Sequence, residues 1–245
     1  MSETWIILGA TSAIARAFVR KLAEKGETLI LAGRNVPELK QIANDLTLRG
    51  AAQADAVAFD ARKPASFDAI IDLAISLSGV INVGVFVGSM PAQSEIDADP
   101  SLLDGVIIDS FTGPARFLQT IAPLMEEREA GTVVGVGSVA GDRGRIGNYV
   151  YGAAKAGFHT YLSGLRNRLT RSGGHVVTVK PGFVDTSMTW GIEGMFLVAS
   201  PEDVANDLMK AVRKKRNVIY TPFFWRYIML ILRNIPEFLF KKMSI

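Results

Sequence analysis

Three polar residues in the second half of the chain have the types and the spacing needed to move a proton. Tyr151 and Lys155 stand four residues apart, so on a helix their side chains share one face. A free phenol titrates near ~10, and a neighbouring ammonium group favours its ionised form, which would bring the pKa of Tyr151 closer to neutrality. Ser138 adds a hydroxyl able to hydrogen-bond a substrate oxygen. We therefore predict that Tyr151 donates or accepts a proton, with Ser138 and Lys155 as catalytic partners.

Competing chemistries lack residues that they require. Tyr149 lies beside the predicted proton donor, but the residue four positions after it is Ala153, so no lysine shares its helical face. A serine hydrolase needs Gly-x-Ser-x-Gly around its nucleophile, whereas Val136 and Ala140 occupy those positions around Ser138. Hydrolysis is therefore not predicted.

Cysteine and histidine content argues against metal or thiol chemistry. The chain contains no cysteine and two histidines, His159 and His175, which have no obvious metal-ligand partners in the sequence. We predict no metal site and interpret both histidines as structural. Nucleic-acid binding would rest only on the basic residues 213–216, without any reader motif, and is not predicted.

A glycine turn follows the first predicted strand. Glycine at this point permits the tight turn, and the free N–H groups that begin the next helix attract a pyrophosphate. The second and third glycines of the usual dinucleotide pattern are Ala13 and Ala15, so a purely structural turn is the alternative. We expect hydroxyl groups to compensate, and predict phosphate binding by Gly9, Thr11, Ser12, Ala13 and Ile14.

The residues that follow the second and third predicted strands bear on the choice of cofactor. An NAD-selective site places a carboxylate after the second strand, where this chain has Gly33-Arg34-Asn35. A guanidinium pairs with phosphate bidentately, so Arg34 predicts NADP(H) as the preferred cofactor, with NAD(H) as the alternative. Asp60 and Ala61 are placed to meet the adenine, although Asp60 also suits a plain turn.

Apolar, β-branched runs alternate with amphipathic stretches along the chain. In residues 13–25, Ile14, Phe18 and Leu22 recur every four residues and form one buried helical stripe that ends at Gly26. The pattern predicts a Rossmann-type, doubly wound α/β fold, with a parallel sheet between two helical layers and a ligand crevice at the carboxyl ends of the strands. The predicted strands are Thr4–Leu8, Thr28–Ala32, Ala54–Phe59, Val80–Val87, Thr132–Val136, Val176–Lys180 and Val218–Thr221.

The length and composition are those of one globular domain. The chain has 245 residues, of which 49% are hydrophobic and 21% charged, and no low-complexity linker divides it, so residues 1–245 are predicted to form a single dinucleotide-binding domain. The first residues do not resemble a secretory signal, and glycines and Pro91 interrupt the uncharged run from Leu73 to Ser94. We therefore expect a cytoplasmic protein. The long helical stretches Leu102–Glu127 and Asn148–Thr170 suggest a homodimer or homotetramer face.

Charge is distributed unevenly along the chain. From Leu208 onward nine Lys or Arg residues face one acid, Glu237, although the net charge of the whole chain is only +3. Residues 222–245 are predicted to form a basic, aromatic helical extension, which contains Phe223, Phe224, Trp225 and Tyr227. This tail either contacts an anionic membrane surface peripherally, or its aromatic side chains close the substrate pocket or pack on the core.

Taken together, these motifs resemble the short-chain dehydrogenase/reductase family across essentially the whole chain. The resemblance rests on the Gly9 turn, Asp60, Gly88, Ser138, Tyr151, Lys155 and the segment Pro181-Gly-Phe-Val-Asp-Thr186. It implies hydride transfer between a nicotinamide cofactor and a carbonyl or alcohol. Lys155 would hold the nicotinamide ribose, and Gly88 would let the cofactor pass close. The nicotinamide would be bordered by Pro181, Gly182, Val184 and Thr186.

Two departures from the family pattern concern the proton relay. The family's Asn-Asn-Ala-Gly after the fourth strand is Val85-Phe86-Val87-Gly88 here, and the asparagine of its catalytic tetrad corresponds to Ser110. We expect an altered proton supply with Ser110 as the fourth catalytic residue. The alternative is a non-catalytic dinucleotide sensor with the same fold.

Within the family, the chain is most similar to decaprenylphosphoryl-2-keto-ribose reductases. The likeness lies in the segments 138–145 and 150–157 and in the tail 225–236. It implies a keto-sugar linked to a polyprenyl phosphate as the substrate, and a small soluble ketone is the alternative.

Overall fold

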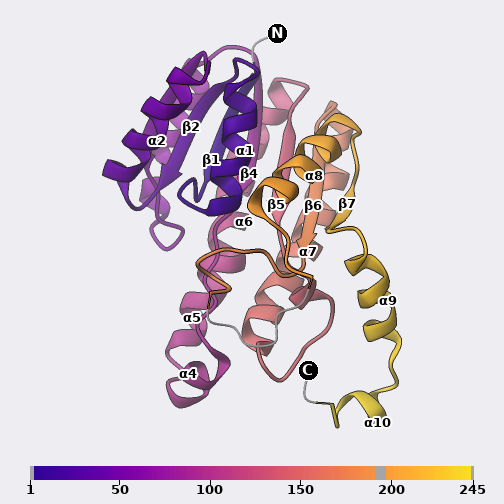
Figure 1. Cartoon of the computed structure of the whole chain (residues 1–245). Coiled ribbons are helices and arrows are strands. Elements are labelled where there is room, and N and C mark those ends of the chain that lie inside the picture. Colours follow the sequence, from indigo (N-terminus) through magenta and orange to yellow (C-terminus); the bar gives the residue numbers. More distant parts are fainter. Residues whose placement is uncertain (1–2, 191–196, 244–245) are drawn as a thin grey trace.

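Seven parallel strands form one sheet that runs through the protein. The computed structural model describes residues 3–190 and 197–243 (Figure 1). All neighbouring strands pair in parallel, in the order β3-β2-β1-β4-β5-β6-β7, which confirms the predicted doubly wound fold. The strands are β1 (Glu3–Leu8), β2 (Thr28–Gly33), β3 (Gln53–Ala58), β4 (Val80–Val85), β5 (Thr132–Val136), β6 (His175–Pro181) and β7 (Val218–Thr221).

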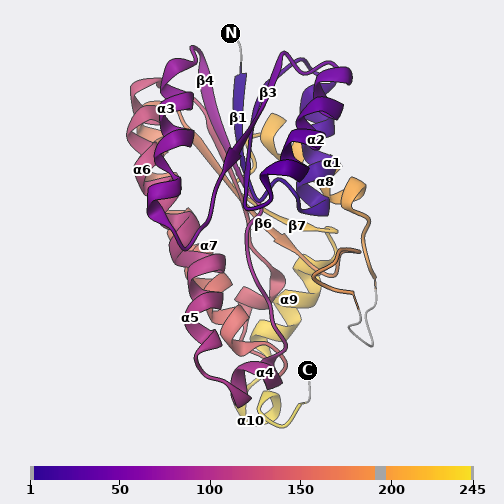
Figure 2. The ribbon, with the colours of Figure 1, turned by 90° about the vertical axis from the view of Figure 1, so that its left-hand side faces the viewer.

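Helices cover both faces of this sheet. Alternate residues of β1 point to opposite sides, so Trp5 and Ile7 join one hydrophobic cluster while Ile6 and Leu8 join the other. Helices α1 (Ala13–Ala23), α2 (Val36–Leu48) and α8 (Pro201–Arg213) lie on the first side, and α3 (Asp68–Ser76), α6 (Gly113–Glu127) and α7 (Tyr149–Leu169) lie on the second (Figure 2). The shorter helices are α4 (Gln93–Ala98), α5 (Leu102–Ile107), η1 (Pro64–Ser66), η3 (Val139–Asp142) and η4 (Thr170–Ser172).

The strand order reverses direction between β1 and β4. From β1 the chain winds outward to β3, and it then crosses back to β4 on the other side of β1. The loops that leave the carboxyl ends of these two strands diverge, which opens a crevice at that edge of the sheet. Both loops carry residues predicted to bind the cofactor, Gly9 and Gly88.

The predicted continuous helix Leu102–Glu127 is interrupted. A π-helical segment, η2 (Ile108–Thr112), separates α5 from α6. Pro114 explains the break, because it lacks the N–H that would bond the Ser110 carbonyl in an α-helix, and its ring clashes with that carbonyl. Directly before the proline, a Cβ on Gly113 would lie 2.5 Å from the Ala61 carbonyl oxygen, so glycine permits the close approach of the two segments.

The C-terminal extension forms two helices, α9 (Trp225–Asn234) and α10 (Glu237–Phe240), beyond β7 (Figure 1). Trp225 and Met229 are buried against Val139. The Arg143 guanidinium donates hydrogen bonds to the Leu232 and Ile235 carbonyl oxygens, at 2.6 and 2.7 Å. The extension therefore packs on the core, as one of the two interpretations expected. None of the described helices is both long enough and apolar enough to cross a membrane.

Candidate active site

A cavity of about 1250 Å³ lies at the carboxyl ends of the strands. Its wall includes residues from the loop after β1, from η3, from α7 and from the loop after β6. It brings together sixteen of the seventeen residues that the sequence predicted for catalysis or cofactor binding; Ser110 does not line it. The sixteen are Gly9, Thr11, Ser12, Ala13, Ile14, Arg34, Asp60, Ala61, Gly88, Ser138, Tyr151, Lys155, Pro181, Gly182, Val184 and Thr186.

The turn after β1 has the geometry of a phosphate site. Gly9 adopts φ +80°, and a Cβ there would meet the Val87 side chain at 2.9 Å. Helix α1 begins directly afterwards with no acidic residue in its first turn and no side-chain hydrogen bond from its N-cap, Ser12. The N–H groups of that turn therefore remain available to an anion, with the positive end of the helix dipole behind them.

The three residues predicted to meet the adenosine end of the cofactor, Arg34, Asp60 and Ala61, line the same cavity. Arg34 is exposed and its guanidinium makes no hydrogen bond to any residue within 3–190 or 197–243. The Asp60 carboxylate accepts a hydrogen bond from the Arg62 backbone N–H at 2.9 Å, so this residue forms a turn as well as lining the cavity. Both interpretations of Asp60 are therefore compatible with its position.

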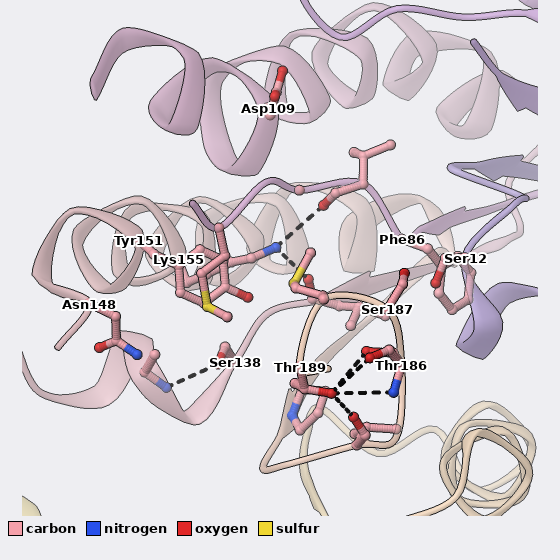
Figure 3. Close-up of a pocket in the computed structure, with 18 of the residues that line it drawn as sticks. Ser12, Phe86, Asp109, Ser138, Asn148, Tyr151, Lys155, Thr186, Ser187 and Thr189 are labelled. Carbon is pink, nitrogen blue, oxygen red and sulfur yellow. Dashed lines mark hydrogen bonds between the residues drawn. The ribbon is translucent and has the colours of Figure 1, made fainter. Parts of the chain in front are cut away.

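Helix α7 brings the predicted proton donor and its lysine partner into the middle of the cavity (Figure 3). Tyr151 and Lys155 are 7% and 3% exposed. The Lys155 ammonium donates to the backbone carbonyl oxygens of Val136 and Val87, at 3.1 and 3.4 Å. These two carbonyls end β5 and follow β4, so the sheet itself fixes the lysine beside the cavity.

Burial changes the acidity of this pair in a direction that the sequence did not predict. It raises the pKa of Tyr151 to about 12, and a hydrogen bond with Ser138 offsets only part of that shift. It also lowers the pKa of Lys155 to about 8. The expectation that Lys155 brings the pKa of Tyr151 toward neutrality is therefore wrong for this structure, because removal from water disfavours both charged forms. Tyr151 is a neutral phenol at physiological pH, the form that donates a proton.

Ser138 is held by its backbone as well as by its own side chain. Its Oγ accepts a hydrogen bond from the Ala140 N–H at 3.1 Å, and its N–H donates to Nε2 of His159 at 3.3 Å. Burial is the main cause that lowers the pKa of His159 to about 3, so the ring is neutral and Nε2 is free to accept. His159, which lies one helical turn after Lys155 in α7, therefore positions the backbone of Ser138.

A buried carboxylate lies behind this histidine. Asp142 accepts hydrogen bonds from the Lys180 ammonium at 2.5 Å and from the Tyr220 hydroxyl at 2.6 Å, and His159 Nδ1 lies 3.8 Å away. These contacts tie η3, which starts next to Ser138, to β6 and β7. No motif in the sequence analysis pointed to Asp142, because its partners lie far away along the chain.

Ser110, predicted as the fourth catalytic residue, lies beside the cavity and not on its wall. It is fully buried, and its Oγ bonds the backbone N–H and carbonyl oxygen of Ser89, each at 3.2 Å. Ser110 belongs to the π-helical segment, and its Oγ lies next to Gly88, which does line the cavity. Ser110 thus links its helix to the loop after β4, and its catalytic role stays a prediction.

Two glycines of the site are required by close packing. A Cβ on Gly88 would lie 3.2 Å from the Lys155 Nζ and 3.3 Å from the Ser110 Oγ. A Cβ on Gly182 would lie 1.9 Å from the Trp225 Nε1, so the loop after β6 rests directly on the start of α9. Gly182 thus lines the cavity with its backbone while its other side accommodates the C-terminal helix.

The substrate side of the cavity includes residues that the sequence analysis did not assign. Gln93, Arg145, Asn148, Met188 and Trp190 line this region. Arg145 and Asn148 lie in the loop that precedes Tyr151, and their position between two predicted catalytic residues was a signal that could have identified them. Gln93 comes from α4, which no sequence pattern connected with the site, and Met188 and Trp190 follow the segment 181–186 that the family resemblance had assigned to the nicotinamide.

Known proteins match nearly the whole length of this chain. The family model described as short chain dehydrogenase matches residues 3–195. An uncharacterized oxidoreductase of Mycobacterium tuberculosis is 31% identical over 239 residues, 97% of this chain and 96% of its own. An uncharacterized oxidoreductase of Streptomyces coelicolor is 31% identical over 244 residues, 98% of this chain and 95% of its own.

Solved structures share the fold. A short-chain dehydrogenase from Sphingobium yanoikuyae in complex with NADPH has a TM-score of 0.80 at 22% identity, and the match covers 97% of each chain. An actinorhodin polyketide ketoreductase with NADPH has a TM-score of 0.77 at 23% identity, covering 89% of this chain and 95% of that one.

Proposed function

The chain belongs to the short-chain dehydrogenase family, and on that premise we propose that it is an NADP(H)-dependent reductase in which Tyr151 protonates the oxygen of a substrate carbonyl. The observation that carries this proposal is that Ser138, Tyr151 and Lys155 line one cavity with the phosphate turn at Gly9. When bound, the nicotinamide supplies the hydride. The open N–H groups at the start of α1, and the missing side chain of Gly9, fit the pyrophosphate of such a cofactor.

The residues of this chain then supply position and a proton. Ser138 donates a hydrogen bond to the carbonyl oxygen and holds it against Tyr151. The Tyr151 hydroxyl gives its proton to that oxygen as the carbonyl becomes an alcohol. Lys155 carries a positive charge below a pKa of about 8, and this charge stabilises the phenolate left behind. A tyrosine with a raised pKa starts in the protonated form, which favours reduction at neutral pH.

The Tyr151→Phe variant tests this proposal. General acid catalysis contributes roughly 10²- to 10⁴-fold in rate, so reduction of carbonyl compounds by NADPH should fall by that order while NADPH still binds. The rate of NADPH oxidation with a set of carbonyl compounds is measured by absorbance, and the affinity for NADPH is measured by fluorescence titration. A variant with unchanged turnover would remove the proposed mechanism. Tight NADPH binding without turnover in the unaltered protein would instead identify a dinucleotide sensor.

We further propose that the preferred cofactor is NADP(H). Arg34 lies on the cavity wall at the end of β2, is exposed, and has no protein partner within the described part of the chain. The sequence places no carboxylate beside it to bond the ribose hydroxyls of NAD(H). A free guanidinium at this position suits the additional phosphate of NADP(H).

We propose that the substrate is a keto-sugar carried on a polyprenyl phosphate and that the extension contacts the membrane that holds this lipid. One face of α9 is buried, whereas Tyr227, Leu230 and Ile231 on its outer side and Phe223 just before it are 59–72% exposed. Exposed basic residues accompany them at Arg226, Arg233, Lys241 and Lys242. Exposed apolar and basic side chains together are typical of an interfacial helix.

Assembly into a homodimer or homotetramer is also proposed, through the faces of α6 and α7 that do not pack on the sheet. The Arg168 guanidinium bonds the Glu126 carboxylate at 2.7 Å and so links these two helices side by side. A paired helical face of this kind suits a two-fold contact. Light scattering during size-exclusion chromatography measures the subunit number.

A further inference from the structure

On the wall of the active-site cavity, Arg145 is a cation that has no hydrogen-bond or ion-pair partner in the described part of the chain. It lies in the loop between η3 and α7, and lines the cavity together with Ser138 and Tyr151. Its Nε is buried and makes no hydrogen bond to any residue of the described ranges 3–190 and 197–243. The neighbouring Arg143 differs, because it bonds two carbonyl oxygens and the Glu237 carboxylate. Arg145 therefore has no comparable structural role among these residues.

This arrangement is unfavourable in the absence of an anion. Burial lowers the pKa of Arg145, and no carboxylate of the described chain acts in the opposite direction. A guanidinium remains charged at neutral pH even so. A partly buried cation without a partner costs free energy of folding, and ligand binding can offset this cost.

A second polar group of the same loop is also unsatisfied. The amide oxygen of Asn148 is buried without a hydrogen-bond partner in the described part of the protein, and Asn148 lines the cavity three residues after Arg145. An amide oxygen accepts a hydrogen bond and would repel an anion. The loop thus offers a site for a negative group and, beside it, an acceptor for a hydroxyl.

The position of the loop separates it from the phosphate turn of the cofactor. In the close-up, Asn148 lies at one end of the drawn part of the cavity and Ser12, at the start of α1, lies at the other, with Tyr151 and Lys155 between them (Figure 3). An anion held by Arg145 would therefore belong to the substrate and not to the cofactor pyrophosphate.

We propose that Arg145 binds an anionic group of the substrate, a phosphate or a carboxylate, while the Asn148 amide accepts a hydrogen bond from a neighbouring hydroxyl. The inference rests on the proposed reductase function and narrows it to acidic, hydroxylated carbonyl compounds. A guanidinium pairs both phosphate and carboxylate through parallel N–H···O bonds, so Arg145 determines specificity by charge and Asn148 by hydrogen bonding.

Matched substrate pairs test the inference through turnover. Ribulose 5-phosphate and ribulose differ by the phosphate, and 4-oxopentanoate and its methyl ester differ by the carboxylate. For at least one pair, we expect the unaltered protein to favour the anion in kcat/KM. In Arg145→Gln this preference should fall about 10- to 100-fold, and Arg145→Lys should retain part of it. Arg171→Gln removes an exposed cation of η4 that does not line the cavity, and should leave the preference unchanged.

A binding measurement keeps the inference separate from catalysis. Calorimetric titration of the NADP⁺-saturated protein with each of the four probes needs no turnover, so it remains informative if the proposed reductase activity is not found. We expect Kd for the preferred anion to rise at least 10-fold in Arg145→Gln, with NADP⁺ affinity unchanged. A loss restricted to one pair identifies the anion as phosphate or carboxylate. Equal affinities of the unaltered protein and Arg145→Gln for both anions, or no binding of any probe, would overturn the inference.

Discussion

The Nε2 atom of His159 accepts a hydrogen bond from the backbone N–H of Ser138 at 3.3 Å. His159 is only 9% exposed, and a Cβ on Gly137, the residue before Ser138, would lie 2.1 Å from the same nitrogen. The contact therefore fixes where β5 ends and where the serine hydroxyl enters the cavity. A histidine that the sequence analysis treated as structural sets the position of a predicted catalytic residue.

Substitution of His159 should change the rate more than it changes cofactor binding. His159→Leu removes the acceptor, whereas His159→Gln retains an oxygen or nitrogen at a similar reach. We expect kcat for carbonyl reduction to fall about 10-fold in the leucine variant, since misplacing a catalytic group by a fraction of an ångström is costly, and less in the glutamine variant. Steady-state kinetics with NADPH in excess measures this, with thermal unfolding as the control for folding. Equal rates in both variants would contradict a positioning role.

The pH dependence of reduction follows from Lys155 and Tyr151. Burial lowers the pKa of Lys155 to about 8, so its ammonium form is lost as the pH rises through this value. Tyr151, with its pKa raised to about 12, remains protonated throughout. We expect kcat/KM for reduction to be level between pH 6 and 7 and to decline above about 8. Lys155→Arg should move the decline to higher pH, because a guanidinium keeps its charge. A rate that rises above pH 8 would contradict this assignment.

Arg34→Ala should reduce the affinity for NADPH about 10-fold and leave the affinity for NADH nearly unchanged. The proposed reason is that the guanidinium would meet only the additional phosphate, while its exposure would limit the size of the effect. Fluorescence titration of both dinucleotides measures the ratio. Lys40→Ala, which removes a nearby exposed cation of α2 away from the cavity wall, serves as the control. An equal loss for both dinucleotides would refute the NADP(H) preference.

Membrane contact by the extension is best tested with surface substitutions. Truncation before α9 would also remove Trp225 and Met229, which are 2% and 0% exposed and belong to the core. The double variant Leu230→Glu, Ile231→Glu changes only the outer side, where these residues are 60% and 67% exposed. It should reduce binding to anionic phosphatidylglycerol vesicles at least 10-fold in a sedimentation assay, because both apolar burial and charge attraction are weakened.

A matched control for this experiment lies elsewhere on the molecule. Leu48 and Ile75 are 89% and 55% exposed, and Leu48→Glu, Ile75→Glu makes the same change of charge away from the extension. The control should bind vesicles as the unaltered protein does. If all three proteins sediment equally, or if none binds, the extension does not contact membranes.

The sequence by itself determined the architecture and most of the site. The spacing of apolar residues predicted the seven strands and the β-α-β order at the start of the chain. This was possible because the spacing is a local property, and each segment forms the same strand or helix in the folded protein. The spacing of Tyr151 and Lys155 predicted one helix face for the same reason. The glycine turn at Gly9 was predictable because its backbone requires positive φ.

Only the tertiary structure decided how these parts act. The pKa of Tyr151 depends on burial, which spacing along a helix does not report. The family resemblance predicted Ser110 as the fourth catalytic residue, and only the structure shows that this serine bonds the backbone of Ser89. The role of His159 depends on its hydrogen bond with the Ser138 N–H, and the role proposed for Arg145 depends on the lack of a partner for its Nε in the described part of the chain. Such contacts join residues distant in sequence, so their free energies are set by packing and desolvation after the elements have assembled.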